Sequence, residues 1–289
     1  MTLTKETNIL IVGLGLMGGS YARALTKKGY AVFAITNEQA SLNYALNAGI
    51  IRGGADHVDP DLVKGADLIV FALYPHVFLN WIGEYGRLIQ PGTLITDVTG
   101  VKTQVVRKVQ EMLPPGVEFI AAHPMAGREK YGVENSDERI FENANYIVTP
   151  TEQNTPGAIA LCEQLGRELG FSRISRLTPE AHDDMIGFLS QLTHCIAVCL
   201  MNCNASPHLE DYTGDSFRDL TRIARINDEM WSELFLLNKD VLIRHMDAFT
   251  ASFQQLRQML ETGDREAMRA AMRHSTQRRA LFDKDKPKT

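Results

Sequence analysis

One histidine has both the position and the chemistry of a proton acceptor. Residues 122–127 read Ala-His-Pro-Met-Ala-Gly and follow an expected strand at 118–122. Ligands in open α/β sheets bind beyond the carboxyl ends of the parallel strands, which is where this pattern places His123. Imidazole titrates near neutrality, so His123 can take a proton from a hydroxyl group while a hydride leaves the same carbon. The alternative is a histidine that is simply hydrogen-bonded within its loop.

A glycine-rich turn near the start of the chain predicts a dinucleotide site. It follows an expected strand at 8–12 directly and opens an expected helix at 18–28. The first glycine of such a turn makes the tight bend, the second lets the backbone approach a pyrophosphate, and the third lets the helix pack on the strand. The helix N-terminus adds free N–H groups and about half a positive charge. The predicted cofactor-binding residues of the turn are Gly13, Leu14, Gly15, Leu16, Met17 and Gly18.

The residue that usually separates NAD from NADP does not decide between them here. An acid is expected after the second strand, at 31–35, to hold the ribose 2′-hydroxyl of NAD, but Thr36 stands at that position. Thr36 donates one hydrogen bond and repels no phosphate, and no arginine follows to grip a 2′-phosphate. Glu38 takes the acid's role if the loop is shifted by two residues. The cofactor is therefore NAD or NADP, and Leu73, at the end of the third apolar run, is a further expected contact.

The elements that position these residues alternate in the first half of the chain. Expected strands cover 8–12, 31–35, 68–73, 93–97, 118–122, 146–149 and 173–177, and expected helices cover 18–28, 41–48, 102–112 and 156–169. This alternation indicates a parallel sheet with right-handed crossovers. Thereafter only helices are expected, at 178–204, 217–237, 239–262 and 264–281. The sequence predicts a doubly wound, Rossmann-type α/β domain over residues 1–176 and an all-α domain over residues 177–289.

Composition excludes several classes of protein. The chain of 289 residues is 44% apolar and 22% charged, which is typical of a globular protein with two domains. A net charge of −5 does not favour nucleic acid or an anionic membrane as a partner. No signal peptide and no apolar run near the ~20 residues of a membrane span are expected. The four cysteines form no CxxC pair and no zinc spacing, so no metal is expected and a reducing cytoplasm fits best.

Together these motifs resemble the prephenate/arogenate dehydrogenases of tyrosine biosynthesis. The resemblance rests on the glycine turn, on the His-Pro-Met-Ala-Gly loop with Arg-Glu-Lys after it, and on several segments of the helical half. Those segments are His182-Asp183, Ser-Gln-Leu-Thr-His at 190–194, Phe-Arg-Asp-Leu-Thr-Arg-Ile-Ala at 217–224, and Trp231. The resemblance implies oxidative decarboxylation of prephenate to 4-hydroxyphenylpyruvate with NAD or NADP. Arogenate is the alternative substrate, with tyrosine as the product.

The resemblance also implies roles for individual residues. His123 corresponds to the catalytic histidine that hydrogen-bonds the ring hydroxyl, and Arg222 to an arginine that binds a substrate carboxylate. Asp219 lies three residues before Arg222 and is expected on the same helix face, where it would orient the guanidinium. Trp231 corresponds to an aromatic residue that the partner subunit brings towards the site. The substrate-binding residues implied in this way are His194, Arg222, Glu129, Asp219 and Trp231.

One departure from the family pattern affects the surroundings of His123. The family often reads Asp-x-x-Ser-x-Lys after the strand at 93–97, whereas this chain has Gly100 in place of the serine. That serine would touch both the catalytic histidine and the substrate. Thr99 is the candidate to replace it as a catalytic residue, and a water molecule is the alternative.

The resemblance implies a homodimer, with the helices of the second half interleaved across a two-fold axis. Two other functions remain open from the sequence. A β-hydroxyacid dehydrogenase or a pyrroline-carboxylate reductase shares the glycine turn but would place a lysine or another group at position 194. A nicotinamide-binding sensor without turnover would bind the cofactor and catalyse nothing.

Overall fold

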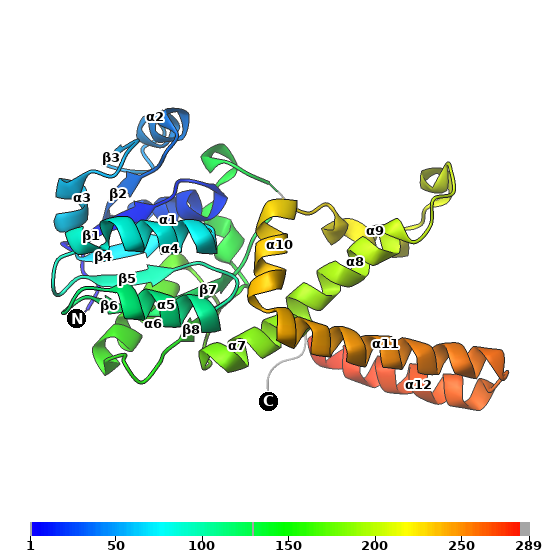
Figure 1. Cartoon of the computed structure of the whole chain (residues 1–289). Coiled ribbons are helices and arrows are strands. Elements are labelled where there is room, and N and C mark those ends of the chain that lie inside the picture. Colours follow the sequence, from blue (N-terminus) through cyan, green and yellow to red (C-terminus); the bar gives the residue numbers. More distant parts are fainter. Residues whose placement is uncertain (1, 129, 284–289) are drawn as a thin grey trace. The chain divides into compact units, whose positions relative to one another are not determined.

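A six-stranded parallel sheet forms the centre of the first half of the chain (Figure 1). The structure is a computed structural model that describes residues 2–128 and 130–283. The spatial order of the strands is β3 (Gly53–Ala55), β2 (Ala31–Ile35), β1 (Asn8–Val12), β4 (Leu68–Phe71), β5 (Leu94–Asp97) and β6 (Glu118–Phe119). Every neighbouring pair is parallel. This order reverses between β1 and β4, as in a doubly wound dinucleotide-binding fold, so the predicted fold class is confirmed.

Alternate side chains of the strands enter two separate hydrophobic cores, one on each face of the sheet. In β1, Ile9 and Ile11 belong to one core and Leu10 and Val12 to the other. The crossover helices of this half are α1 (Leu16–Lys27), α2 (Gln39–Asn47), α3 (Pro60–Lys64), α4 (Pro75–Tyr85), α5 (Thr103–Met112) and α6 (Pro156–Leu169). Strands buried on both faces read as continuous apolar runs, which is why the sequence located them well.

A second sheet of three strands carries the histidine loop. Its order is β7 (Ala121–Met125), β8 (Asn145–Thr149) and β9 (Arg173–Arg176), with β7 and β8 antiparallel. The single strand expected at 118–122 is therefore wrong, because the chain leaves β5 after Phe119 and starts a new strand. His123 lies inside β7, opposite Ile147, and not beyond the end of a parallel strand. The strand partner changes from β5 to β8 within a few residues. At this point the Asp97 carboxylate accepts a hydrogen bond from the Ala122 backbone N–H at 3.1 Å.

The helices after β9 begin with one continuous helical run. It consists of α7 (Pro179–Ile186), a π-helical segment (Gly187–Leu192) and α8 (Thr193–Asn202). Thr178 starts the run by accepting a hydrogen bond from the Ala181 N–H. Within the described part of the chain, this run alone is long and apolar enough to cross a membrane, by length and composition only, with a mean hydropathy of 1.4. A core helix of a soluble protein passes the same test, so the observation is weak evidence for a membrane span.

The single helix expected at 217–237 is wrong. The structure instead has α9 (Asp215–Thr221), a 3₁₀ turn (Arg222–Ala224) and α10 (Asp228–Leu237). Asn227 accepts a hydrogen bond from the Met230 N–H at 2.9 Å and so starts a new helix. This cap competes with continuation of the preceding helix. Asn227 is a typical N-cap residue, so the break could have been predicted from the sequence.

The last two helices belong to a separate compact unit that starts at Asp240. They are α11 (Lys239–Glu261) and α12 (Arg265–Arg279). Gly263, with φ of +70°, makes the turn between them, and Asp264 caps α12. No residue of α12 is buried. The exposed large apolar residues of this unit's helices are Ile243, Met246, Phe249, Phe253, Leu256, Leu260 and Met272.

Candidate active site

The glycine turn between β1 and α1 is built so that a larger residue would not fit at two of its positions. Gly13 has φ of +102°, and a Cβ there would lie 2.5 Å from the Ala72 carbonyl oxygen. A Cβ on Gly18 would lie 1.9 Å from the Gly13 carbonyl oxygen. The Gly13 N–H donates to the Ile35 carbonyl at 2.8 Å, which ties the turn to β2. The glycines at these two positions are therefore required by the turn itself.

Gly15 differs from the other two glycines because a side chain at this position would point into open space. Apart from Gly15 itself and its neighbours along the chain, no atom lies within 4 Å of a Cβ built on Gly15. Gly15 is also the N-cap residue of α1, and no side chain caps the helix there. An uncapped N-terminus of a 12-residue helix, next to open space, suits a pyrophosphate. The residues present thus fit a dinucleotide cofactor.

Two other predicted cofactor contacts lie at the ends of the neighbouring strands. Thr36 follows β2 directly, is 8% exposed, and donates its N–H to the Ala55 carbonyl. Its hydroxyl accepts a hydrogen bond from the Glu38 N–H at 3.4 Å, while the Glu38 carboxylate accepts from Ser41. Leu73 follows β4 and lies against the turn, since its Cδ2 would be 2.9 Å from a Cβ on Gly13.

A buried lysine braces the backbone next to His123. The Lys102 ammonium is fully buried and donates to the Asp97 carboxylate at 2.7 Å and to the Ala122 carbonyl at 2.6 Å. Asp97 in turn accepts from the Ala122 N–H, so both polar backbone groups of Ala122 are held. Burial lowers the pKa of Lys102, and the charge of Asp97 opposes this shift. This brace was not predicted from the sequence, although Asp97 and Lys102 are the first and last residues of the Asp-x-x-Ser-x-Lys pattern.

Thr99 belongs to this brace. Its hydroxyl donates to the Asp97 carboxylate and also contacts the Val101 carbonyl oxygen and the Lys102 ammonium. A Cβ on Gly100 would lie 3.3 Å from Cδ1 of Leu234, so a serine there would press against α10. Thr99 therefore acts on His123 through the Ala122 backbone, and its assignment as a catalytic residue stays a prediction.

The side chain of His123 has a partner that the sequence did not suggest. Its Nδ1 lies 2.8 Å from Nε2 of His182, and Nδ1 of His182 lies 2.8 Å from the Asp183 carboxylate. His182 is completely buried and His123 is partly exposed. From the sequence alone, Asp183 next to His182 indicates a cap or a role in supporting the site more than catalysis. Only the packing of α7 against β8 and α5 brings it to His123.

Burial keeps both imidazoles neutral, and hydrogen bonds keep the Asp183 carboxylate ionised. Burial lowers the pKa of His123 well below 6.5, and the neighbouring His182 and the charge of Lys102 lower it further. Burial also lowers the pKa of His182, against the opposing effect of Asp183. Burial raises the pKa of Asp183, but hydrogen bonds from His182 and Thr103 outweigh it, so the net pKa is lowered. His123 is thus a neutral imidazole at neutral pH.

Two predicted substrate-binding residues lie against each other. The ring of His194, at the start of α8, stacks on Trp231 of α10 with centroids 3.7 Å apart. Nδ1 of His194 donates to the Ser190 carbonyl at 2.8 Å, within the π-helical segment. π-Helical turns often occur at functional sites. In this structure the two aromatic rings come from the same chain.

The predicted carboxylate-binding arginine lies outside the helix that was expected to carry it. α9 ends at Thr221, and Arg222 begins the 3₁₀ turn, which packs against α8. Arg222 is the C-cap residue of α9 and keeps helical dihedral angles (φ −50°, ψ −42°), and the expectation that Asp219 orients its guanidinium stays a prediction. Glu129, the remaining predicted substrate contact, lies outside the described residues.

Helix α10 is anchored at the strand-end loops. The Glu233 carboxylate accepts hydrogen bonds from the backbone N–H and the imidazole Nδ1 of His76, at 2.6 and 2.8 Å. The Asn227 amide donates to the Tyr74 hydroxyl at 3.0 Å. Both contacts hold α10 to the start of α4, next to Leu73, so the helix that carries Trp231 is fixed close to the glycine turn.

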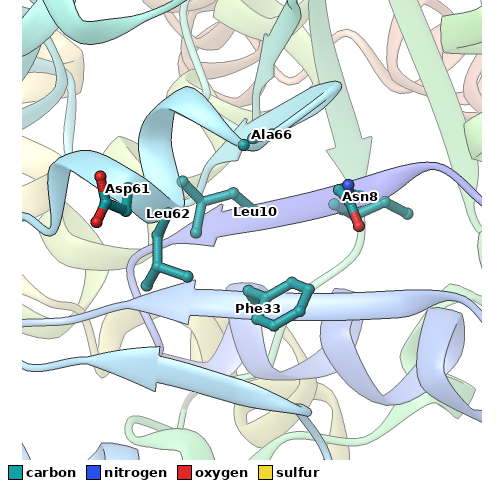
Figure 2. Close-up of a pocket in the computed structure, with 8 residues that line it drawn as sticks. Asn8, Leu10, Phe33, Asp61, Leu62 and Ala66 are labelled. Carbon is teal, nitrogen blue, oxygen red and sulfur yellow. The ribbon is translucent and has the colours of Figure 1, made fainter.

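A cavity elsewhere in the fold is not part of this site. Figure 2 shows it between α3 and the strands β1 and β2, with Leu10, Phe33 and Leu62 among its lining residues. Its volume of about 220 Å³ is below the ~300–1,000 Å³ of typical ligand pockets. It also reaches Asn8 at the amino end of β1, whereas ligands of parallel sheets bind at the carboxyl ends.

The fold and the site together define a class of protein. A dinucleotide-binding turn follows β1, a neutral histidine lies in β7 beside the Asp97–Lys102 brace, and α10 is anchored at the start of α4. Within the described residues, no group of histidine, cysteine or acidic side chains is arranged to hold a metal ion. These features are those of an NAD(P)-dependent oxidoreductase with a helical second half.

Comparison with known proteins identifies the family. Residues 21–174 match the family model of the nucleotide-binding domain of prephenate dehydrogenase, and residues 178–274 match that of its dimerization domain. The chain belongs to the prephenate dehydrogenase family. Its cofactor is NAD or NADP.

Three similar proteins cover nearly the whole chain. Prephenate dehydrogenase of Bacillus subtilis strain 168 is 32% identical over 92% of this chain and 73% of its own length. Cyclohexadienyl dehydrogenase of Zymomonas mobilis is 28% identical over 98% of each chain. A crystal structure of prephenate dehydrogenase from Aquifex aeolicus, in complex with hydroxyphenyl propionate and NAD+, has a TM-score of 0.89 and 27% identity. It covers 98% of this chain and 100% of that chain.

Proposed function

We propose that this chain oxidises and decarboxylates prephenate to 4-hydroxyphenylpyruvate, with NAD or NADP as hydride acceptor, in tyrosine biosynthesis. The observation that carries the proposal is the neutral, partnered imidazole of His123 in a chain of this family. A neutral imidazole with one ring nitrogen engaged by His182 has its other nitrogen available to a substrate hydroxyl.

The proposed reaction needs one proton acceptor and an aromatising ring. The dinucleotide supplies a hydride acceptor when it is bound at the glycine turn. His123 accepts the proton of the ring hydroxyl as the C–H bond on the same carbon breaks. The electron pair of the bond to the departing carboxylate then enters the ring, CO2 leaves, and the proton returns to the phenolate oxygen. The ring becomes aromatic, so no metal ion is needed for the decarboxylation.

The proposed substrate contacts lie in the helical half. Prephenate carries two carboxylates, and the guanidinium of Arg222 suits a bidentate contact with one of them. The stacked pair of His194 and Trp231 offers a rigid wall for the ring of the substrate. Asp219 and Glu129 are proposed to shape the polar surroundings.

We assign residues 1–176 to cofactor binding and residues 177–289 to substrate binding and dimerisation. A homodimer is supported by the exposed apolar side chains of α11 and by the helical run Pro179–Asn202, in which an apolar window of 18 residues is only 28% buried within the chain. Large exposed apolar faces of this kind mark protein interfaces. We propose the cytoplasm as the location. A monomeric mass by light scattering at micromolar concentration would refute the dimer.

The decisive experiment is an absorbance assay at 340 nm on the purified chain, in which prephenate and arogenate are each combined with NAD and with NADP. Activity with prephenate is the expected result, and the better cofactor shows how Thr36 acts. Activity with arogenate alone would keep the mechanism but change the substrate. Cofactor binding without turnover in all four combinations would contradict the proposal and favour a sensor.

A further inference from the structure

We infer that Asp183 and His182 act as a relay that holds His123 in one tautomer, with the proton on Nδ1 and the lone pair on Nε2. This inference rests on the proposed function, because it assigns positioning residues for the proton acceptor of that reaction. It differs from the expectation drawn from the sequence, in which the Thr99 hydroxyl or a water molecule takes the place of the family serine that touches the histidine.

The relay begins with a carboxylate that is held by three hydrogen bonds. One oxygen of Asp183 accepts from the Lys102 N–H and from Nδ1 of His182, each at 2.8 Å. The other oxygen accepts from the Thr103 N–H at 2.8 Å. Both backbone groups lie at the start of α5, so Asp183 is tied to the helix that follows the Asp97–Lys102 brace. An ionised carboxylate in this place can only accept hydrogen bonds.

The tautomers of the two histidines follow from that fixed acceptor. Nδ1 of His182 must carry a proton in order to donate to Asp183, so Nε2 of the neutral ring is an acceptor. The 2.8 Å contact between the two rings then requires the proton on Nδ1 of His123. The remaining nitrogen of His123, Nε2, is left with its lone pair. That is the form in which it can receive the proton of a hydroxyl.

The position of His123 in β7 limits how else its ring can be oriented. Ala122, the preceding residue, is held on both its N–H and its carbonyl by Asp97 and Lys102. The backbone therefore has little freedom, and the contact with His182 is the only hydrogen bond resolved for the ring among the described residues. A substitution that removes the acceptor at position 182 should therefore leave the backbone in place and allow both tautomers of His123 to become populated.

The test compares two substitutions that differ only in the acceptor. His182→Met fills a similar volume without an acceptor, whereas His182→Gln places an amide oxygen within reach of Nδ1 of His123. We expect His182→Met to lower kcat by roughly 10²-fold and to leave KM for prephenate within about twofold. His182→Gln should regain most of the loss. The loss in His182→Met should persist at every pH, because raising the pH does not exchange tautomers of a neutral ring.

Nitrogen NMR of the imidazoles reads the tautomer without any turnover. In the wild-type chain labelled with ¹⁵N-histidine, Nδ1 of His123 should show the shift of a protonated nitrogen and Nε2 that of an unprotonated one. The His123→Asn variant assigns these signals. In His182→Met the two shifts should move towards each other as both tautomers become populated. His57→Met, which alters a surface histidine paired with Asp56, is the matched control and should change neither the shifts nor kcat.

Three results would overturn the relay. The first is an unprotonated Nδ1 of His123 in the wild-type chain, and the second is a kcat of His182→Met equal to that of the wild type. The third is a lower kcat in His182→Met that His182→Gln fails to improve while the ¹⁵N shifts stay unchanged. Absence of turnover by the wild type with all four substrate and cofactor pairs would instead contradict the proposed function, and the NMR measurement would still decide the relay.

Discussion

The imidazole of His194 lies on the indole of Trp231, with ring centroids 3.7 Å apart and ring planes inclined by 29°. The hydrogen bond from the histidine to the Ser190 carbonyl fixes the imidazole, and the anchoring of α10 at His76 fixes the indole. The pair therefore connects two helices that are held independently. A rigid aromatic wall of this kind binds a ring without having to be ordered by it.

Replacement of Trp231 by leucine should weaken substrate binding more than turnover. An aromatic pair contributes ~0.5–1.5 kcal/mol beyond its buried area, so KM for prephenate should rise roughly 2- to 10-fold with kcat nearly unchanged. Steady-state kinetics measures both constants. Trp81→Phe, in a buried cluster with Phe71, is the control and should leave KM unchanged. An unaltered KM in Trp231→Leu would remove Trp231 from the site.

Replacement of His123 by asparagine should abolish most of the chemistry and spare cofactor binding. A positioned general base contributes roughly 10²–10⁴-fold, so kcat should fall by that factor. The glycine turn is formed by other residues, so the affinity for NAD or NADP, measured by calorimetry, should not change. Turnover near that of the wild type would end the assignment of His123 as the proton acceptor.

The activity should persist in mildly acidic solution. Burial, His182 and Lys102 lower the pKa of His123 well below 6.5, so its base form survives as the pH falls through that value. We expect the acid limb of the profile of kcat/KM against pH to lie below pH 6.5, because this limb reports the free enzyme. A limb at or above pH 6.5 would contradict the lowered pKa of His123.

The same burial should make the fold less stable in acid. Below pH 6.5 an unfolded chain protonates His123 and His182, whereas the folded chain does not, because the pKa of each is lowered in the folded state. The unfolded state then binds more protons, so stability falls as the pH drops below 6.5. The dependence of Tm on pH should be shallower in His123→Asn than in the wild type.

Replacement of Arg222 by alanine should chiefly raise KM for prephenate. A hydrogen bond to a charged group contributes ~1.5–3 kcal/mol, which corresponds to roughly a 10- to 100-fold change in KM. Arg218, which pairs with Asp215 at 3.0 Å on an exposed surface, supplies the comparison variant Arg218→Ala. If KM stays unchanged in Arg222→Ala, the carboxylate contact belongs to Arg218 or Arg225.

Two glycines of the same turn should respond differently to alanine. Gly15→Ala places its Cβ in open space at φ of −91°, so Tm should not change while KM for the dinucleotide rises. Gly13→Ala forces a Cβ to within 2.5 Å of a carbonyl oxygen at φ of +102°, so it should lower Tm instead. Thermal melts and cofactor titrations separate the two. An unaffected cofactor KM in Gly15→Ala would contradict pyrophosphate binding at this turn.

Local sequence patterns located most elements but failed where a strand or helix changed its partner. The run at 118–122 is apolar throughout, so nothing in it marks the point where the chain leaves β5 for a second sheet. The Asp97 side chain, 25 residues away, makes that break by binding the Ala122 N–H. The end of α9 at Thr221 is similar, because the helical pattern continues through 217–237 while the Asn227 cap starts a new helix.

The sequence by itself determined the glycine turn and the alternation of strands and helices around it, and it predicted His123 as the reactive histidine. These features depend on residue type and on spacing along a short stretch of chain, such as glycine where φ is positive and apolar runs where strands are buried. Only the tertiary structure decided what His123 contacts. His182 lies 59 residues further along the chain, and its 2.8 Å contact arises because Asp183 binds the start of α5 and brings α7 to β7. The tautomer of a histidine depends on such through-space partners, and a linear pattern does not encode them.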